Sequence, residues 1–314
     1  GSEMCIRDSY HSVIDWRHPE YVVDGLHPMR ENLEFREANK DRDISIYREY
    51  LHGQTRELLT QFGDIDVMWY DFSYPQHNWD WAKGKGRDDW DSERLMAMVR
   101  ELQPGILVNN RLDIPGDFTT PEQYQPAGPM MIDGKPVLWE ACQTLNGSWG
   151  YDRDNLDWKS VDMLVQMLID TVSKDGNLLL NVGPNARGEF EPRSLASLRG
   201  IGEWMRLHSR SIYGCGPSEF TPPPDCRYTQ KGDRLYLHLF NWPFRHVHLE
   251  GLGPRVAYAQ MLNDHSEVGM KVVDPSQAAI NTTMGGLGAD VLTLELPIQR
   301  PDVAVPVVEL FLKS

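Results

Sequence analysis

Residues 65–72 read Ile-Asp-Val-Met-Trp-Tyr-Asp-Phe, a short and nearly continuous apolar run that Asp66 interrupts and Asp71 closes. Strands of a parallel sheet have this composition, because helices cover both faces and leave no solvent side for alternating polar residues. Within residues 44–62, upstream, apolar residues recur at three- and four-residue spacing, and Gly63 supplies a stop. This part of the chain therefore predicts a helix followed by a buried parallel strand that ends in a carboxylate.

The same alternation continues along the chain. Helical spacing predicts further helices over 92–102, 161–172 and 195–205, and apolar runs predict strands near Tyr10 and at 106–108, 137–139 and 177–182. Such alternation implies a parallel sheet, either doubly wound or closed into an eight-stranded barrel. Five strands are about three fewer than a barrel needs, so a barrel here is expected to be incomplete, with its N-terminal strands missing.

The two ends of the chain differ from this pattern. Residues 1–9 show no hydrophobic period and are predicted to be a tag or non-native leader, which leaves 10–216 as the barrel portion. After the stiff connector at 222–224, apolar runs recur without a helical period up to the C-terminus. We therefore expect residues 217–314 to form a small antiparallel β-domain.

Bulk composition excludes several classes of protein. Of 314 residues, 40% are hydrophobic and 25% are charged, which is ordinary for a globular protein. The net charge of −15 disfavours nucleic acid and anionic membranes as partners, because both reward Lys and Arg. No apolar stretch approaches the roughly 20 residues that a membrane span requires.

Cysteine and histidine spacing gives little sign of cross-links or metal. Four cysteines are too few for a disulfide scaffold at this length, and a single Cys215–Cys226 bridge is left open. His246 and His248 could share one face of a strand, as a metal pair does, but no third ligand is near in the sequence. No metal site is predicted.

Polar residues close each predicted strand, at Asp15, Asp71, Asn109 to Arg111, Glu140 and Asn181. In parallel α/β barrels the active site lies at the C-terminal ends of the strands, so these residues are expected to line it. Carboxylates, amides and one guanidinium, accompanied by aromatic residues, indicate a carbohydrate site better than a metal or phosphate site.

Glycoside hydrolysis generally uses two carboxyl groups. Asp71, at a rigid strand end, is a candidate nucleophile, and the alternative is a residue that caps the next turn. Glu122 lies in the polar loop 116–123 and is a candidate acid/base, with a solvated loop glutamate as the alternative. Glu140 competes with Glu122 as proton donor, or else is a buried partner of Arg111.

Arginine and tryptophan residues near these strand ends also have two interpretations. Arg111 either holds a substrate hydroxyl and keeps the nucleophile ionised, or makes a structural ion pair. Trp69, Trp139 and Trp149 are either stacking platforms for a sugar or residues of the core.

Several stretches in order and spacing resemble the α-L-fucosidases of glycoside hydrolase family 29. They are YHSVIDW (10–16), HPEY (18–21), DVMWYD (66–71), NNR (109–111), GDFTTPE (116–122), WEAC (139–142), SWGY (148–151), WKS (158–160), SKDGNLLLNVGP (173–184) and IYG (212–214). The resemblance implies a (β/α)8-like barrel, a C-terminal β-sandwich and no cofactor. It also implies retaining hydrolysis of terminal α-L-fucose, with Asp71 as nucleophile and Glu122 as acid/base. The predicted substrate-binding residues are Tyr10, Trp69, Arg111, Glu140 and Trp149.

Expectations about partners and location follow from the same resemblance. The substrate is expected to be a fucosylated oligosaccharide or glycoconjugate, and the resemblance admits a homo-oligomer. A secreted, periplasmic or lysosomal compartment is expected. Members of the family also bind fucose through residues of their first strands, which this sequence is expected to lack. The alternative is therefore a catalytically inactive truncated fragment or a carbohydrate-binding protein.

Overall fold

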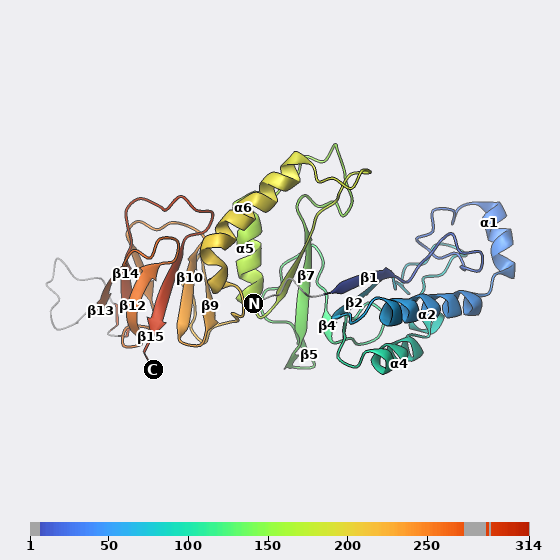
Figure 1. The fold of residues 1–314 in the computed structure, drawn as a ribbon, viewed down its shortest axis with the longest axis horizontal. Helices are drawn as coiled ribbons and strands as arrows, with labels where there is room; N and C mark the ends of the chain where they lie inside the picture. The colour runs from blue at the N-terminus through green and yellow to red at the C-terminus, as the bar shows by residue number, and fades with distance from the viewer. Residues whose placement is uncertain (1–6, 273–286, 289, 314) are drawn as a thin grey trace. The chain divides into compact units, whose positions relative to one another are not determined.

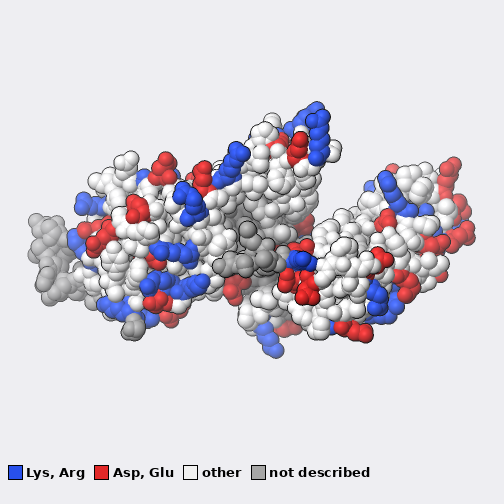
Figure 2. All heavy atoms as spheres, in the orientation of Figure 1, with Lys and Arg blue, Asp and Glu red and all other residues white. Residues whose placement is uncertain are grey.

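A computed structural model describes residues 7–272, 287–288 and 290–313. Residues 1–6 of the predicted leader lie outside the described residues, whereas Asp8 and Ser9 belong to the first strand. The chain divides into two compact units, Gly1–Thr120 and Pro121–Ser314 (Figure 1). On the face shown in Figure 2, acidic and basic side chains are interspersed over each unit.

The first unit contains a parallel sheet with strand order β1-β2-β3. Its strands are β1 (Asp8–Ser12), β2 (Val67–Asp71) and β3 (Leu107–Val108). The register places Ser12 opposite Asp71, so the ends of β1 and β2 lie at the same edge of the sheet. The predicted buried strand is confirmed as the central strand β2.

Helices of the first unit supply the other side of its core. Asp43 caps the N-terminus of α2 (Ile44–Gln61), because its side chain accepts from the Ser45 amide. α2 packs against α4 (Ser92–Leu102). Asp91 precedes α4 at the N-cap position, and its side chain pairs with Arg94 at 2.8 Å and makes no capping bond. The remaining short elements were not predicted and are α1 (Leu33–Ala38), η2 (Asn39–Asp41), α3 (Arg87–Trp90) and β4 (Phe118–Thr119).

The second unit contains another parallel pair, β7 (Leu138–Thr144) and β8 (Asn177–Asn181). α5 (Val161–Val172) joins them, and α6 (Pro192–His208) follows. β7 extends five residues beyond the predicted strand at 137–139. Gln143 and Thr144 at its end are polar in type although they are buried, so the apolar run that predicts a strand stops before them. The smaller elements are β5 (Met131–Ile132), β6 (Lys135–Pro136) and η3 (Ser209–Ser211).

The C-terminal part is antiparallel, as predicted, and forms two sheets with orders β12-β15-β10-β9 and β11-β14-β13. Leu237 and Leu310 from the first sheet and Leu294 from the second are fully buried in one shared core, which is the arrangement of a β-sandwich. The strands are β9 (Cys226–Lys231), β10 (Arg234–Leu239), β11 (His246–Leu249), β12 (Val256–Met261), β13 (Gly269–Val272), β14 (Leu292–Glu295) and β15 (Val307–Leu312).

Two smaller expectations can be compared with the structure. Cys215 and Cys226 are both free thiols, so the bridge left open from the sequence is not formed. His248 Nδ1 lies 2.9 Å from Thr293 Oγ1, and His246 Nε2 lies 3.7 Å from a Glu295 carboxylate oxygen. Across the described residues no group of three metal-ligating side chains occurs.

No described helix combines the length and the apolar character that crossing a bilayer demands.

Candidate active site

Asp71 is the last residue of β2, and its side chain is 14% exposed. The Tyr10 hydroxyl donates to Oδ2 at 2.8 Å, and Arg111 Nη1 donates to Oδ1 at 3.0 Å. Oδ1 also accepts from the Phe72 amide at 2.8 Å and from the Tyr74 hydroxyl at 3.3 Å. The carboxylate therefore has a fixed orientation and a guanidinium counter-charge.

Strand register explains how Tyr10 reaches Asp71. Tyr10 lies opposite Trp69, and residues two apart on a strand share a face, so Asp71 lies on the same face as Trp69. A diagonal neighbour is within reach of a long aromatic side chain. The rings of Tyr10 and Trp69 stack with centroids 5.7 Å apart. The pairing of β1 with β2 thus brings three predicted site residues together.

Arg111 is held at three points besides Asp71. Its Nε donates to Thr120 Oγ1 at 2.8 Å and its Nη2 to the Thr120 carbonyl at 3.2 Å. The guanidinium carbon lies 4.7 Å from the centroid of the Trp69 ring, a cation–π distance. Since each nitrogen has a defined partner, the planar fork is oriented before any ligand binds.

The Tyr10 hydroxyl stays protonated and can therefore donate a hydrogen bond to Asp71. Desolvation, and then the hydrogen bond to Asp71, raise the pKa of Tyr10 above its ordinary value. The phenol is therefore protonated at neutral pH and cannot add negative charge beside the carboxylate.

Phe72, directly after Asp71, has φ of 76°, and Gln123, directly after Glu122, has φ of 57°. Bulky residues rarely adopt this left-handed region, which costs free energy that the surrounding structure must offset. At Phe72 the conformation directs the backbone N–H onto the Asp71 carboxylate. Both candidate catalytic carboxylates are thus followed by an unfavourable backbone conformation, which is a feature of functional sites and one that the sequence analysis missed.

Asn109 does not belong among the residues that line the site. Its Nδ2 donates to the Tyr70 carbonyl at 2.8 Å, and its Oδ1 accepts from the Tyr70 amide at 3.1 Å. The side chain is fully buried. Asn109 is therefore a clamp on the backbone of β2, one residue before Asp71.

The other predicted carboxylates lie in the second unit. Glu122 is exposed and forms an isolated parallel bridge with Cys142 of β7. Backbone bonds of 2.9 Å flank it, from Cys142 N to Pro121 O and from Gln123 N to Cys142 O. Glu140 is half-buried on β7, two residues before Cys142. Both glutamates thus lie on or beside one strand.

The two tryptophans of the second unit differ from each other. Trp149 is 41% exposed, and its carbonyl accepts from Asn181 Nδ2 at 2.7 Å. Trp139 is 3% exposed and donates from Nε1 to the Lys174 carbonyl at 3.1 Å. Trp139 is a core residue, whereas Trp149 presents an aromatic surface to solvent.

Parallel strand–helix units, an antiparallel β-sandwich, and carboxylates at strand ends with aromatic neighbours define an α/β protein whose candidate site suits a carbohydrate better than a phosphate. The profile of the Alpha-L-fucosidase family matches residues 6–210, more than half of the chain. The chain belongs to this family.

Individual relatives agree with this assignment. The Alpha-L-fucosidase of Branchiostoma floridae is 27% identical over 249 residues, which are 74% of this chain and 49% of that protein. That of Dictyostelium discoideum is 26% identical over 318 residues, 96% of this chain and 62% of that protein. The chain thus spans only part of the length of these curated relatives.

A solved structure extends the comparison to the fold. Alpha-L-fucosidase isoenzyme 1 from Paenibacillus thiaminolyticus is 41% identical with a TM-score of 0.84, covering 97% of this chain and 71% of that one. The predicted fold class, a (β/α)8-like barrel followed by a β-sandwich, is confirmed by this likeness. Within the residues described here, the parallel strands form open sheets and not a closed barrel.

Proposed function

We propose that this chain carries the catalytic carboxylates of a retaining exo-α-L-fucosidase that removes terminal α-L-fucose from glycans. Membership of the family supports the reaction class. The observation that carries the proposal is the orientation of Asp71 by Tyr10 and Arg111. A carboxylate held at a strand end by donors from two other elements suits a nucleophile better than a turn cap.

In the first step, Asp71 attacks the anomeric carbon while Glu122 donates its proton to the departing glycosidic oxygen. Oδ1 accepts from Phe72, Tyr74 and Arg111, whereas Oδ2 accepts from Tyr10, so we assign the attack to the less engaged Oδ2. The Arg111 bond to Oδ1 then keeps the carboxyl plane aligned as the ester forms. The products are a fucosyl ester of Asp71 and the free leaving group.

In the second step, the Glu122 carboxylate takes a proton from water, and the resulting hydroxide oxygen bonds to the anomeric carbon. The ester bond breaks, and its electron pair returns to Asp71. Fucose leaves with retained configuration, and both carboxyl groups regain their starting protonation. An exposed Glu122 suits this role, because the same group must meet leaving group and water in turn.

Substrate contacts are proposed for five residues. Tyr10, Trp69 and Arg111 surround Asp71, where the fucose ring must lie during attack. Glu140 offers a carboxylate for sugar hydroxyls, and the exposed ring of Trp149 offers a stacking surface. We further propose that residues 10–216 form the barrel portion and 217–314 the β-sandwich domain.

A second candidate is a carbohydrate-binding protein without turnover. The exposed ring of Trp149 supports it, because a stacking surface serves binding as well as turnover. The test is release of 4-nitrophenol from 4-nitrophenyl α-L-fucoside, by this chain and by this chain fused to the unmatched part of the Paenibacillus enzyme.

Asp71→Asn accompanies each form as its control. Release by either form that disappears in Asp71→Asn supports the fucosidase. Fucose binding without release in both forms supports the binding protein.

A further inference from the structure

Residues 121–126, called here the Glu122 segment, are fastened to β7 by side chains as well as by backbone. Gln123 Nε2 donates to Thr144 Oγ1 at 3.0 Å, and Gln143 Nε2 donates to the Tyr124 carbonyl at 3.1 Å. With the two backbone bonds around Glu122, these contacts fix one side of the segment. They hold it against the strand that carries Glu140.

The other side of the Glu122 segment is held by α5 and the turn after it. Gln125 contacts Met167 and Thr171 through its amide group, at 3.5 and 3.2 Å. Lys174 Nζ donates to the Pro126 carbonyl at 2.8 Å. Lys174 therefore fixes the end of the segment, four residues after Glu122.

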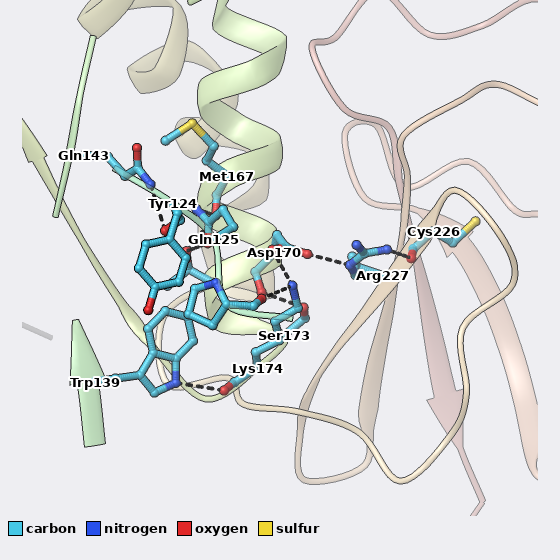
Figure 3. Close-up of polar contacts among 12 residues, drawn as sticks. Tyr124, Gln125, Trp139, Gln143, Met167, Asp170, Ser173, Lys174, Cys226 and Arg227 are labelled. Carbon is cyan, nitrogen blue, oxygen red and sulfur yellow. Dashed lines mark hydrogen bonds and ion pairs between the residues drawn. The ribbon is translucent and has the colours of Figure 1, made fainter. Parts of the chain in front are cut away.

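Lys174 is in turn held by Asp170, a carboxylate that is 7% exposed (Figure 3). Asp170 Oδ2 accepts from Lys174 Nζ at 2.6 Å, and Oδ1 accepts from Arg227 Nε at 2.7 Å. Arg227 belongs to β9 of the antiparallel region, and its Nη1 donates to the Cys226 carbonyl at 2.8 Å. A continuous path of polar contacts thus joins β9 to the Glu122 segment.

Stability alone is a weak explanation for this cluster. Ion pairs taken out of water regain little net free energy, and apolar replacements of the same shape are often as stable. Such pairs fix the positions of the bonded side chains relative to each other, because each carboxylate oxygen accepts hydrogen bonds along its lone-pair directions. Here the two oxygens of Asp170 bond to two cations on different elements.

We propose that Asp170, Lys174 and Arg227 are a positioning cluster through which the antiparallel β-region fixes the segment that bears Glu122. The inference rests on the proposed role of Glu122 as acid/base. None of the three side chains is assigned contact with the substrate. They influence the reaction by fixing the backbone of the segment that carries the proton donor Glu122.

Amide hydrogen exchange tests the link without requiring turnover. The variants are Arg227→Met and Asp170→Asn, which remove the ion pair from either side. Losing one charge-assisted anchor is expected to speed exchange of the Gln123 and Cys142 amides about tenfold. The amide exchange rate in β10 is the internal reference, because a general loss of stability would raise it as much as the rate in the Glu122 segment.

Arg255→Met is the matched control. Arg255 pairs with the Glu219 carboxylate at 3.2 Å and lies 5.3 Å from the Phe220 ring, as Arg227 lies 5.3 Å from Phe240. Within the described residues, Arg255 pairs with Glu219 and shares no hydrogen bond or ion pair with Asp170. Arg255→Met is expected to leave exchange of the Glu122 segment unchanged, and Arg227→Lys is expected to restore part of the protection.

A kinetic readout separates positioning from mere stability. Phenolate is a poor leaving group, so hydrolysis of phenyl α-L-fucoside depends on protonation of the leaving oxygen by Glu122. Dinitrophenolate leaves readily without a proton, so hydrolysis of the 2,4-dinitrophenyl fucoside depends on Glu122 far less. In the form that turns over, Arg227→Met is expected to lower kcat/KM for the phenyl substrate about tenfold more than for the dinitrophenyl substrate.

The inference is overturned if the Glu122 segment exchanges equally in Arg227→Met, Asp170→Asn and Arg255→Met. Equal kinetic losses on both substrates in Arg227→Met would overturn it as well. If Glu122→Gln itself leaves the leaving-group dependence unaltered, the proposed role of Glu122 fails. The exchange comparison then still decides whether the cluster holds the segment.

Discussion

The hydroxyl of Tyr10, on β1, donates a 2.8 Å hydrogen bond to Oδ2 of Asp71 at the end of the neighbouring strand β2. Arg111, which follows β3 in the chain, donates to the other oxygen of this carboxylate, Oδ1. Side chains from three successive strand units therefore converge on one carboxylate. Parallel pairing produces this convergence, because it aligns the carboxyl ends of the strands at one edge.

Removing the Tyr10 hydroxyl tests its role at Oδ2. Tyr10→Phe keeps the ring beside Trp69 and is expected to lower kcat/KM about 10- to 100-fold, the usual value of a hydrogen bond to a charged group. Steady-state hydrolysis of an aryl α-L-fucoside measures it. Tyr213→Phe is the control, since Tyr213 is comparably exposed at 51% against 58%. Equal rates in both variants would contradict the assignment.

Arg111 should not tolerate replacement by lysine. Its Nε and Nη1 serve Thr120 and Asp71 separately, and an ammonium group cannot reproduce that fork. We expect Arg111→Lys and Arg111→Met to lower kcat/KM by a similar amount, at least about 10-fold. Near-complete activity in Arg111→Lys would show that only the positive charge matters.

Asn109 is predicted to matter for stability. Asn109→Leu leaves the buried N–H and C=O of Tyr70 without their partners, which should cost about 2–4 kcal/mol of unfolding free energy. Urea unfolding measures the loss. Asn110→Leu, at the exposed neighbouring position, is expected to cost less than about 0.5 kcal/mol. A comparable loss in both variants would rule out the clamp.

His238 gives the fold a defined acid sensitivity. Complete burial, and then the nearby His208, lower the pKa of His238 to about 3. Thr229 donates its hydroxyl proton to the Ser211 carbonyl, so His238 Nε2 donates to Thr229. The lowered pKa of His238 keeps the ring neutral at pH 7. The unfolded chain binds a proton below its ordinary pKa of about 6.5, whereas the folded chain does not.

The stability that neutral His238 contributes is therefore fully present above about pH 6.5 and is lost as pH falls toward 3, by about 1.4 kcal/mol per pH unit. Urea unfolding between pH 7 and 5 measures the slope. His238→Gln, which can still donate to Thr229, should flatten it, and the exposed His265→Gln should not. An unchanged slope in His238→Gln would disprove the assignment.

Sequence patterns sufficed for the elements whose hydrophobic period is clean. β2, α2, α4 and α5 lie close to their predicted ranges. The strand-end rule also selected Asp71 and Arg111, which the structure brings into contact. These features depend on the local spacing of apolar and polar residues, so they can be predicted from one sequence.

Features that depend on tertiary contacts were missed. The predicted strand ended at residue 139 and missed the buried polar end of β7, where Gln143 donates to the Tyr124 carbonyl of another segment. Asn109 was grouped with site residues, since its clamp on β2 is invisible without the sheet. The left-handed Phe72 conflicts with the preference of its residue type, so propensity could not reveal it.

The most direct test of the central claim, that Asp71 is the nucleophile, is covalent trapping with a 2-fluoro-fucosyl fluoride followed by peptide mass spectrometry. The electronegative fluorine slows release of the ester, so the intermediate accumulates. We predict one added fluorofucosyl group on the peptide that contains Asp71, and none in Asp71→Asn. A label on any other residue, or an aryl fucoside hydrolysed with inversion and no label, would contradict the account.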